Sequence, residues 1–232
     1  MKLAKNKHVS GVRKKQEKIR RAGRPVGQNQ EQAIRAALLQ AAREQFARCD
    51  FKAVSIRQIA ATVGVNPAMV HYYFGNKEGL YLAMLETSFA PLMAQLEVLQ
   101  DNESENSRDA IAAFLRSYMK TLLAEPWLPN LIVREILYRE GGLREQFIRL
   151  FGLKVDSLLL RLLERRKQEG YQVAVLQPQL SALSLISMAA FPFIARPVVE
   201  QVFQLKLDEE SVEQMIEHIL SLYYPDTLVG SA

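Results

Sequence analysis

The sequence predicts an all-α protein. Apolar residues recur every three or four positions along most of the 232 residues, no run alternates convincingly with a period of two, and capping or breaking residues separate the apolar segments. We expect a mobile basic arm over residues 1–27, a three-helix helix-turn-helix head over residues 28–76, and a helical body over residues 77–232. A hydrophobic content of 49% is enough for a sizeable core.

Positive charge is concentrated in the arm. Ten Lys or Arg residues against one acid give it a net charge of +9, which leaves −4 for the rest of a chain whose total is +5. A basic arm on an acidic body favours a polyanion such as nucleic acid at one end. Arg20, Arg21 and Arg24, beside Gly23 and Pro25, resemble an AT-hook, whose arginines enter a narrow A·T-rich minor groove. The alternative is a solubilising tail.

The head should begin with two helices. The first is expected over residues 30–48, where apolar residues form one face. Ser55 followed by Gln58 has the spacing of a capping box, in which the hydroxyl accepts from a first-turn amide while the glutamine reaches back. The second helix is therefore expected to begin at Ile56.

A third, short helix should follow a glycine turn at Gly64. Asn66 can cap its amides, Pro67 suits a first helical position, and Gly75 with Asn76 ends it. The residues expected in a common core are Ile56, Ile59, Ala60, Val65, Val70 and Phe74. The residues expected outside, where a DNA groove would meet them, are Arg57, Asn66, Pro67, Ala68, Met69, His71 and Tyr72. An ordinary helical hairpin, whose tyrosines cover the core edge, is the alternative.

From about residue 32 to residue 80 the chain resembles the DNA-binding head of the TetR/AcrR family of transcriptional repressors. The matching segments are AIRAALLQAAREQFAR, DFKAVSIRQIAATVGV, NPAMVHYYF and GNKEGL. The resemblance implies base or sugar contacts from Asn66, Pro67, Ala68, His71 and Tyr72, and phosphate contacts from Ser55, Arg57 and Lys77. Two positions depart from the family: His71 replaces a common tyrosine, and Met69 replaces a small polar residue.

The body should open with a long helix after Asn76 that links it to the head. Its apolar seam is Leu82, Leu85, Phe89, Leu92, Leu96 and Leu99. Pro91 lies inside this helix and predicts a kink. Further helices are expected over residues 108–123, 131–139, 143–169, 179–205 and 209–223, with a polar loop over residues 101–107.

The helix expected over residues 179–205 is apolar around most of its circumference, so a second surface should cover it besides the last helix. By resemblance, that surface is the same helix pair of another subunit, which gives a homodimer; the alternative is an internal helix of a monomer. The expected interface residues are Leu183, Ile186, Ala190, Phe191, Ile194, Met215, Ile219 and Tyr223.

The resemblance also implies a small-molecule effector, bound in the body, that shifts the fourth helix and changes the spacing of the two heads. Aromatic and methionine side chains of the body could enclose a mostly apolar pocket, with Arg134 and Glu135 as a polar anchor. The candidate lining residues are Phe89, Met93, Phe114, Tyr118, Trp127, Arg134, Tyr138, Phe147 and Met188. For each of these residues taken alone, the alternative of plain core or surface is favoured over ligand contact.

Other classes of protein fit less well. The three histidines, His8, His71 and His218, fall in separate regions, so neither a catalytic triad nor a metal site is expected, and no cofactor is expected. A single cysteine, Cys49, suits a reducing cytoplasm, and we expect the protein at the nucleoid. The uncharged stretch 171–195 contains glutamines, serines and prolines, so we interpret it as buried protein and not as a bilayer helix. A sequence-independent architectural protein, binding DNA through its arm, is the main alternative to a regulator.

Overall fold

The computed structural model describes residues 28–102, 106–138, 140–171 and 177–225. Throughout these ranges the ordered elements are helices, with no strand, which confirms the predicted fold class. The head consists of three helices, α1 (Gln28–Arg48), α2 (Ile56–Val63) and α3 (Ala68–Phe74). The arm, with Arg20, Arg21 and Arg24, lies outside the described residues.

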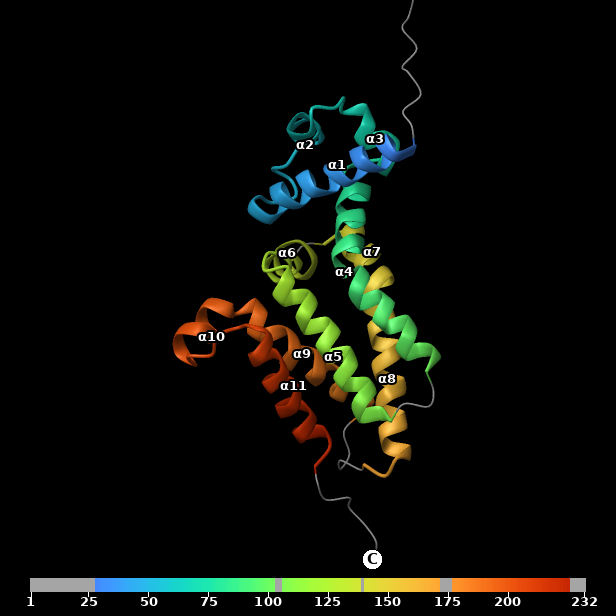
Figure 1. The fold of residues 1–232 in the computed structure, drawn as a ribbon, viewed down its shortest axis with the longest axis vertical. Helices are drawn as coiled ribbons and strands as arrows, with labels where there is room; N and C mark the ends of the chain where they lie inside the picture. The colour runs from blue at the N-terminus through green and yellow to red at the C-terminus, as the bar shows by residue number, and fades with distance from the viewer. Residues whose placement is uncertain (1–27, 103–105, 139, 172–176, 226–232) are drawn as a thin grey trace, which may run out of the picture.

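One long helix, α4 (Lys77–Asp101), begins under the head and runs into the body (Figure 1). All six residues of its predicted seam are buried. Because Leu80 and Tyr81 lie in the core at the head end, and Phe89 and Leu92 lie in the core of the body, the same helix contributes to both cores. Pro91 lies inside α4 without ending it.

The body contains α5 (Ser107–Ala124), α6 (Leu128–Ile132), α7 (Gly142–Phe147), α8 (Leu153–Gln168), α9 (Pro178–Ile194), α10 (Arg196–Val202) and α11 (Glu209–Tyr223). Two π-helical segments interrupt the regular winding: η1 (Val133–Leu137) continues α6, and η2 (Ile148–Gly152) joins α7 to α8. Helices α6 and α7 lie directly beneath the head, whereas α5, α8, α9 and α11 form the rest of the bundle (Figure 1).

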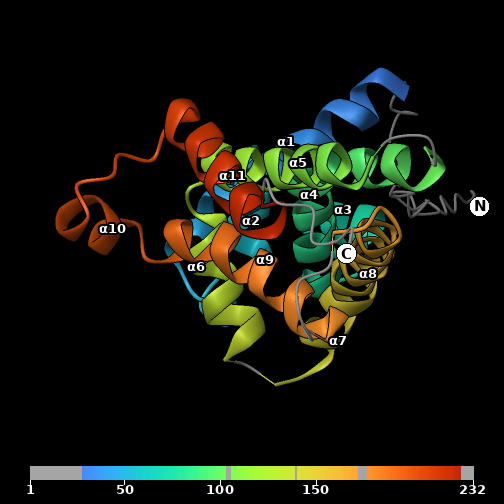
Figure 2. The same cartoon turned by 90° about the horizontal axis from the view of Figure 1, so that it is seen from below.

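The prediction of one helix over residues 179–205 is wrong. The chain bends by 80° between α9 and α10, and α10 projects from the side of the body (Figure 2). Pro197 explains the break, because it has no N–H for the helical bond to the carbonyl of Phe193 and its ring would collide with that carbonyl. The same residue is compatible with the first turn of a new helix, which is where it lies in α10.

The predicted helix over residues 131–139 also begins earlier, at Leu128. Pro129 falls in its first turn, where a missing N–H costs nothing. The expected single helix over residues 143–169 is helical throughout to Gln168, but it contains the η2 segment. Such π-helical turns frequently occur at functional sites.

Candidate nucleic-acid interface and ligand cavity

The start of α2 has the capping box that the sequence predicts. The Ser55 N–H donates to Gln58 Oε1 (2.9 Å), and the Gln58 N–H donates to Ser55 Oγ (3.2 Å). Gly64 ends the helix in the left-handed region, at φ 74°, and its N–H reaches the carbonyls of Ala60 and Ala61. A residue with a side chain is strained at that φ, so glycine suits the turn between α2 and α3.

Asparagine side chains cap the first turns of α3 and α4. Asn66 Oδ1 accepts from the Ala68 N–H (2.8 Å) and so caps α3, and Asn76 Oδ1 accepts from the Gly79 N–H (2.7 Å) and caps α4. A Cβ on Gly79 would lie 2.0 Å from the carbonyl oxygen of Phe74, so only glycine permits α3 and α4 to approach this closely. The orientation of α3 on α4 is therefore set by local contacts.

The head core is small and aromatic. Ile59, Ala60 and Val70 are fully buried as predicted, whereas the other predicted core residues, Ile56, Val65 and Phe74, are half-buried. The rings of Phe46, Phe51 and Tyr81 meet at centroid distances of 4.9 to 5.7 Å. This cluster holds α1 and the α1–α2 link against α4.

The outward face of α2 and α3 is exposed. Exposed side chains there are Ser55, Arg57, Asn66, Ala68, His71 and Tyr72, whereas Pro67 and Met69 are half-buried. Tyr72 is 69% exposed and packs edge-on against Tyr73, at a centroid distance of 5.0 Å. A large aromatic side chain held out to solvent on a short helix can contact a partner without first rearranging.

His71 has one ring nitrogen already engaged. Its Nδ1 lies 2.8 Å from the carbonyl oxygen of Gly75. Because a carbonyl only accepts, Nδ1 must donate, which leaves Nε2 of the neutral ring as a hydrogen-bond acceptor. The carbonyl of Gly75, at the C-terminal end of α3, therefore determines which tautomer the neutral His71 ring adopts.

Lys77, from which the sequence predicts a phosphate contact, is half-buried, and its ammonium has partners within the head that the sequence reasoning missed. Its Nζ donates to the carbonyls of Phe51 (2.7 Å) and Val54 (2.9 Å) and sits 4.3 Å from the centroid of the Phe51 ring. The ammonium therefore holds the α1–α2 link against the start of α4.

Arg134 and Glu135 of η1 join the body to the head. Arg134 donates to the carbonyls of Phe46 and Cys49, at 3.0 Å each, and pairs with Asp50 at 3.0 Å. Glu135 is 1% exposed and accepts from the N–H of Phe51 (2.9 Å). The predicted role of this pair as an anchor inside the pocket is therefore not supported by its position.

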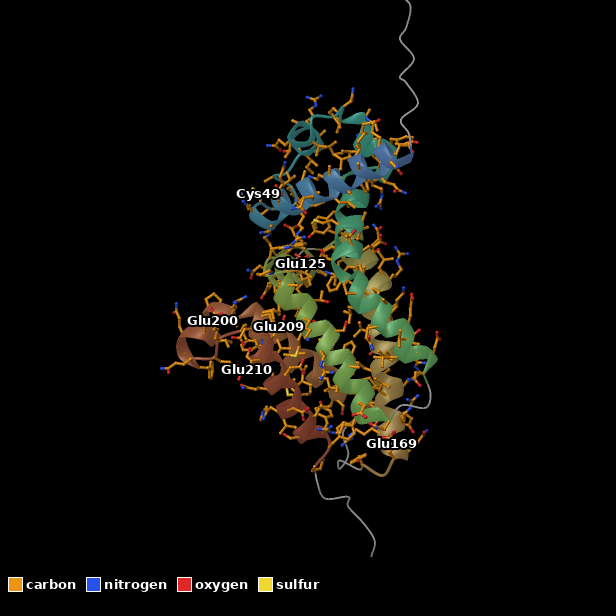
Figure 3. The ribbon with its side chains drawn as sticks, in the orientation of Figure 1. Cys49, Glu125, Glu169, Glu200, Glu209 and Glu210 are labelled. Carbon is orange, nitrogen blue, oxygen red and sulfur yellow. The ribbon has the colours of Figure 1, made fainter. Side chains whose placement is uncertain are left out.

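A second polar contact between head and body lies on α1. Arg43 pairs with Glu125 at 2.7 Å, and the same carboxylate accepts from Trp127 Nε1 at 2.5 Å. Figure 3 shows Glu125 between the head and the body, with Cys49 at the edge of the head. A displacement of the segment after α5 can therefore be transmitted to the head through the Arg43–Glu125 ion pair as well as through α4.

The body encloses a cavity of about 340 Å³. Its wall comes from α4, α5, α6, α7, η2, α8 and α9. The lining residues are Phe89, Leu92, Tyr118, Ile132, Phe147, Phe151, Gly152, Val155, Asp156, Leu159, Gln179, Ala182, Leu183 and Ile186. A mostly apolar cavity of this size, with a few polar groups, is typical of a small-molecule site.

Three of the nine candidate lining residues, Phe89, Tyr118 and Phe147, line this cavity. Phe114 is fully buried and stacks on Tyr118, and Tyr138 is 83% exposed. The remaining candidates lie elsewhere: Met93 and Met188 line two other hollows, and Trp127 and Arg134 lie at the head–body junction. The sequence reasoning missed Phe151, Val155 and Leu159, whose spacing of four residues after Phe147 marks one stripe of a helix.

The proposed dimer residues divide into three groups, which are exposed, half-buried and buried. On α9, Leu183 and Phe191 are about 60% exposed, at 61% and 59%, and Ile194 is also exposed. Ala190, Ile186 and Met215 are half-buried. Ile219 and Tyr223 are buried, and Tyr223 donates from its hydroxyl to the Ser181 carbonyl, so these two hold α11 to its own body. An apolar groove between α9 and α11, lined by Met188, Phe191 and Met215 among others, lies beside the exposed stripe.

The described residues hold no cluster of three or more His, Cys, Asp or Glu side chains that could bind a metal ion. By length and composition alone, α4 could cross a membrane, and α9 with α10 pass the same test as a bent pair. A core helix also passes that test, and the seam of α4 is packed inside the protein. Within the stretch 171–195, residues 172–176 lie outside the described residues, and α9 is buried on one side.

Comparison with known proteins gives one family match. The profile described as "Bacterial regulatory proteins, tetR family" matches residues 38–84, from α1 to the first turns of α4. The chain is similar to the HTH-type transcriptional regulator BetI of Rhizobium meliloti (strain 1021), with 28% identity over 130 residues, 56% of this chain and 62% of that protein. It is similar to RutR of Escherichia coli (strain K12), with 29% identity over 105 residues, 45% of this chain and 49% of that protein. The alignments thus span about half to three fifths of these relatives.

Solved structures are similar over most of the chain. The fatty acid degradation regulator FadR from Bacillus halodurans superposes with a TM-score of 0.64 at 17% identity, covering 83% of this chain and 95% of that chain. FadR from Bacillus subtilis, solved in complex with stearoyl-CoA, gives a TM-score of 0.63 at 16% identity, covering 83% and 98%. At such low identity the likeness establishes the fold alone.

Proposed function

We propose that this chain, which belongs to the TetR family of transcriptional regulators and is not an enzyme, is a repressor that binds a palindromic operator as a homodimer and is released by a small, largely apolar effector. The observation that carries this proposal is the course of α4. The helix contributes Tyr81 to the core beside the DNA-binding head and Phe89 and Leu92 to the wall of the cavity. A ligand that displaces the cavity wall therefore acts on the helix that supports α3.

We propose that the exposed face of α2 and α3 enters the major groove. Asn66, Pro67, Ala68, His71 and Tyr72 would face bases and sugars, and Ser55 and Arg57 would face phosphates. In its neutral form, the His71 ring offers an acceptor at Nε2, which suits an amino group of adenine or cytosine. Lys77 is left out of this interface, because its ammonium already binds two carbonyls of the head. Arg20, Arg21 and Arg24 of the arm would add minor-groove contacts.

We propose that α9 and α11 form the dimer interface. The exposed apolar stripe of Leu183, Phe191 and Ile194 on α9 would be covered by the same stripe of a second copy. Two heads related by a two-fold axis reach successive major grooves when they lie about 34–36 Å apart or a multiple of that distance. A small change in their separation then breaks the register, so a ligand that favours the wrong separation weakens DNA binding.

Selection of bound fragments from random DNA by the purified full chain tests the proposal. We expect the selected fragments to share a palindromic consensus and to bind two protomers each. In cells, we expect the protein in the cytoplasm, at the nucleoid. Bound DNA without any consensus would instead indicate a sequence-independent architectural protein that uses its basic arm. A consensus without inverted symmetry would contradict the homodimer.

A further inference from the structure

The cavity of the body has one charged side chain in its wall. Of the fourteen residues that line it, Asp156 alone carries a full charge at neutral pH, and no lysine, arginine or histidine is among them. Asp156 lies on α8 and is exposed, so its carboxylate is at the mouth of the cavity and not in its depth. A charged ligand therefore meets a negative charge as it enters.

One wall of the cavity is aromatic. Phe89 of α4, Phe147 of α7 and Phe151 of η2 form a cluster with centroid distances of 6.0 Å (Phe89–Phe147), 4.8 Å (Phe89–Phe151) and 5.1 Å (Phe147–Phe151). The faces of aromatic rings carry partial negative charge, so they attract cations as well as apolar groups. The η2 segment places Phe151 and Gly152 together on this wall.

The remaining polar groups are neutral. Burial raises the pKa of the Tyr118 hydroxyl to about 12, so Tyr118 keeps its proton at any physiological pH. Gln179 offers a neutral amide at the start of α9. Neither group supplies the positive charge that a buried anion needs.

Two nearby features bear on the sign of the charge. The N-terminus of α9, at Gln179, carries roughly half a positive charge, which is smaller than the full charge of the Asp156 carboxylate and favours an anion only within its first turn. The adjoining hollow on the other side of Phe151 is lined by Glu86, Glu97 and Lys154, two acids and one base. Together, the linings of the two hollows carry three acids and one base.

We propose that the cavity binds an apolar cation, such as a lipophilic amine or quaternary ammonium compound, with its apolar part against the three phenylalanines and its charge at Asp156. This inference rests on the proposed function, because it assigns a chemical class to the effector. It separates this chain from the Bacillus subtilis FadR structure, which holds stearoyl-CoA. The phosphates of a CoA group would meet a carboxylate here and none of the cationic side chains that bind phosphate.

Two ions of the same shape and opposite charge test the inference. Tetraphenylphosphonium and tetraphenylborate are titrated separately into the full chain by calorimetry, without DNA. We expect the phosphonium to bind at least tenfold more tightly than the borate. Asp156→Asn should reduce that preference at least fivefold, whereas Glu164→Gln, which removes an equal charge from an exposed position two turns further along α8, should leave it unchanged.

Equal affinity for the two ions, tighter binding of the borate, or no binding of either would overturn the inference. So would an Asp156→Asn protein that keeps the full preference. Failure of the proposed function has a different signature, because these titrations contain no DNA. A phosphonium that binds selectively but leaves operator binding unchanged would contradict the effector role and leave the charge selectivity of the cavity standing.

Discussion

Replacing Lys77 by methionine should destabilise the head, because its ammonium binds two carbonyls of the α1–α2 link instead of a phosphate. The substitution keeps most of the aliphatic stem but removes two charge-assisted hydrogen bonds, to the carbonyls of Phe51 and Val54, and the contact with the Phe51 ring. Each such hydrogen bond contributes about 1.5 kcal/mol or more, and the cation–π contact about 0.5 kcal/mol. The expected loss is therefore about 3.5 kcal/mol of unfolding free energy, or about 10 °C in Tm for a chain of this size.

Thermal and urea unfolding of the full chain, followed by circular dichroism, measures this loss. Lys52→Met is the matched control, because it removes the same charge from an exposed position in the same link and should change stability by less than about 0.5 kcal/mol. The reasoning is refuted if Lys77→Met unfolds like the wild type and, at the same time, the salt dependence of DNA binding falls by about 0.9 in log–log slope, the signature of one lost phosphate contact.

Four further outcomes are expected. Ser55→Ala removes the cap of α2 and should cost about 1 kcal/mol in urea unfolding; an unchanged midpoint would contradict the role of the cap. Tyr72→Ala should weaken binding to every selected operator in an anisotropy titration while Tm stays constant, since the side chain is 69% exposed. Phe191→Glu should shift the sedimentation coefficient from dimer to monomer, and a persistent dimer would exclude the α9 interface. Arg116 lowers the pKa of Glu213 below its ordinary value of 4.5, so the pair stabilises the fold above that pH and loses its effect as pH falls through the lowered pKa. Because both side chains are about 40% exposed, Glu213→Gln should cost less than about 1 kcal/mol at pH 7, and this cost should shrink progressively as the pH is lowered below 4.5, as measured by urea unfolding at each pH.

The sequence predicts the head better than the body because the signals in the head are local. The Ser55–Gln58 box and the caps at Asn66 and Asn76 each involve groups two or three residues apart, so their spacing is visible in the chain. The seam of α4 is equally local, because it depends only on helical periodicity. The ends of α2, α3 and α4 therefore follow from the sequence to within about one residue.

The failures involve partners far apart in the chain. Arg134 reaches Phe46, 88 residues earlier, and Glu135 reaches Phe51, 84 residues earlier, so no spacing rule could show that they join the body to the head. Phe114 and Phe147 are both phenylalanines on body helices, yet one is sealed in the core and the other lines the cavity. That difference depends on how the helices pack, which a single sequence does not show.

Whether a proline ends a helix also depends on packing that the sequence alone does not show. Pro91 and Pro192 lie inside α4 and α9 without ending them, whereas the break before α10 falls at Pro197. A helix tolerates a proline when packing of its other residues outweighs one lost hydrogen bond. The seam of α4 is buried on both sides of Pro91, whereas most residues of α10 are exposed.

The most direct test of the regulator described here is the mass and symmetry of its complex with selected DNA. Native mass spectrometry of the full chain on a selected duplex should show two protomers, and hydroxyl-radical footprints should show two protected patches related by a two-fold axis, with fewer complexes when an effector is added. One protomer per duplex with a single unsymmetric footprint would contradict the account.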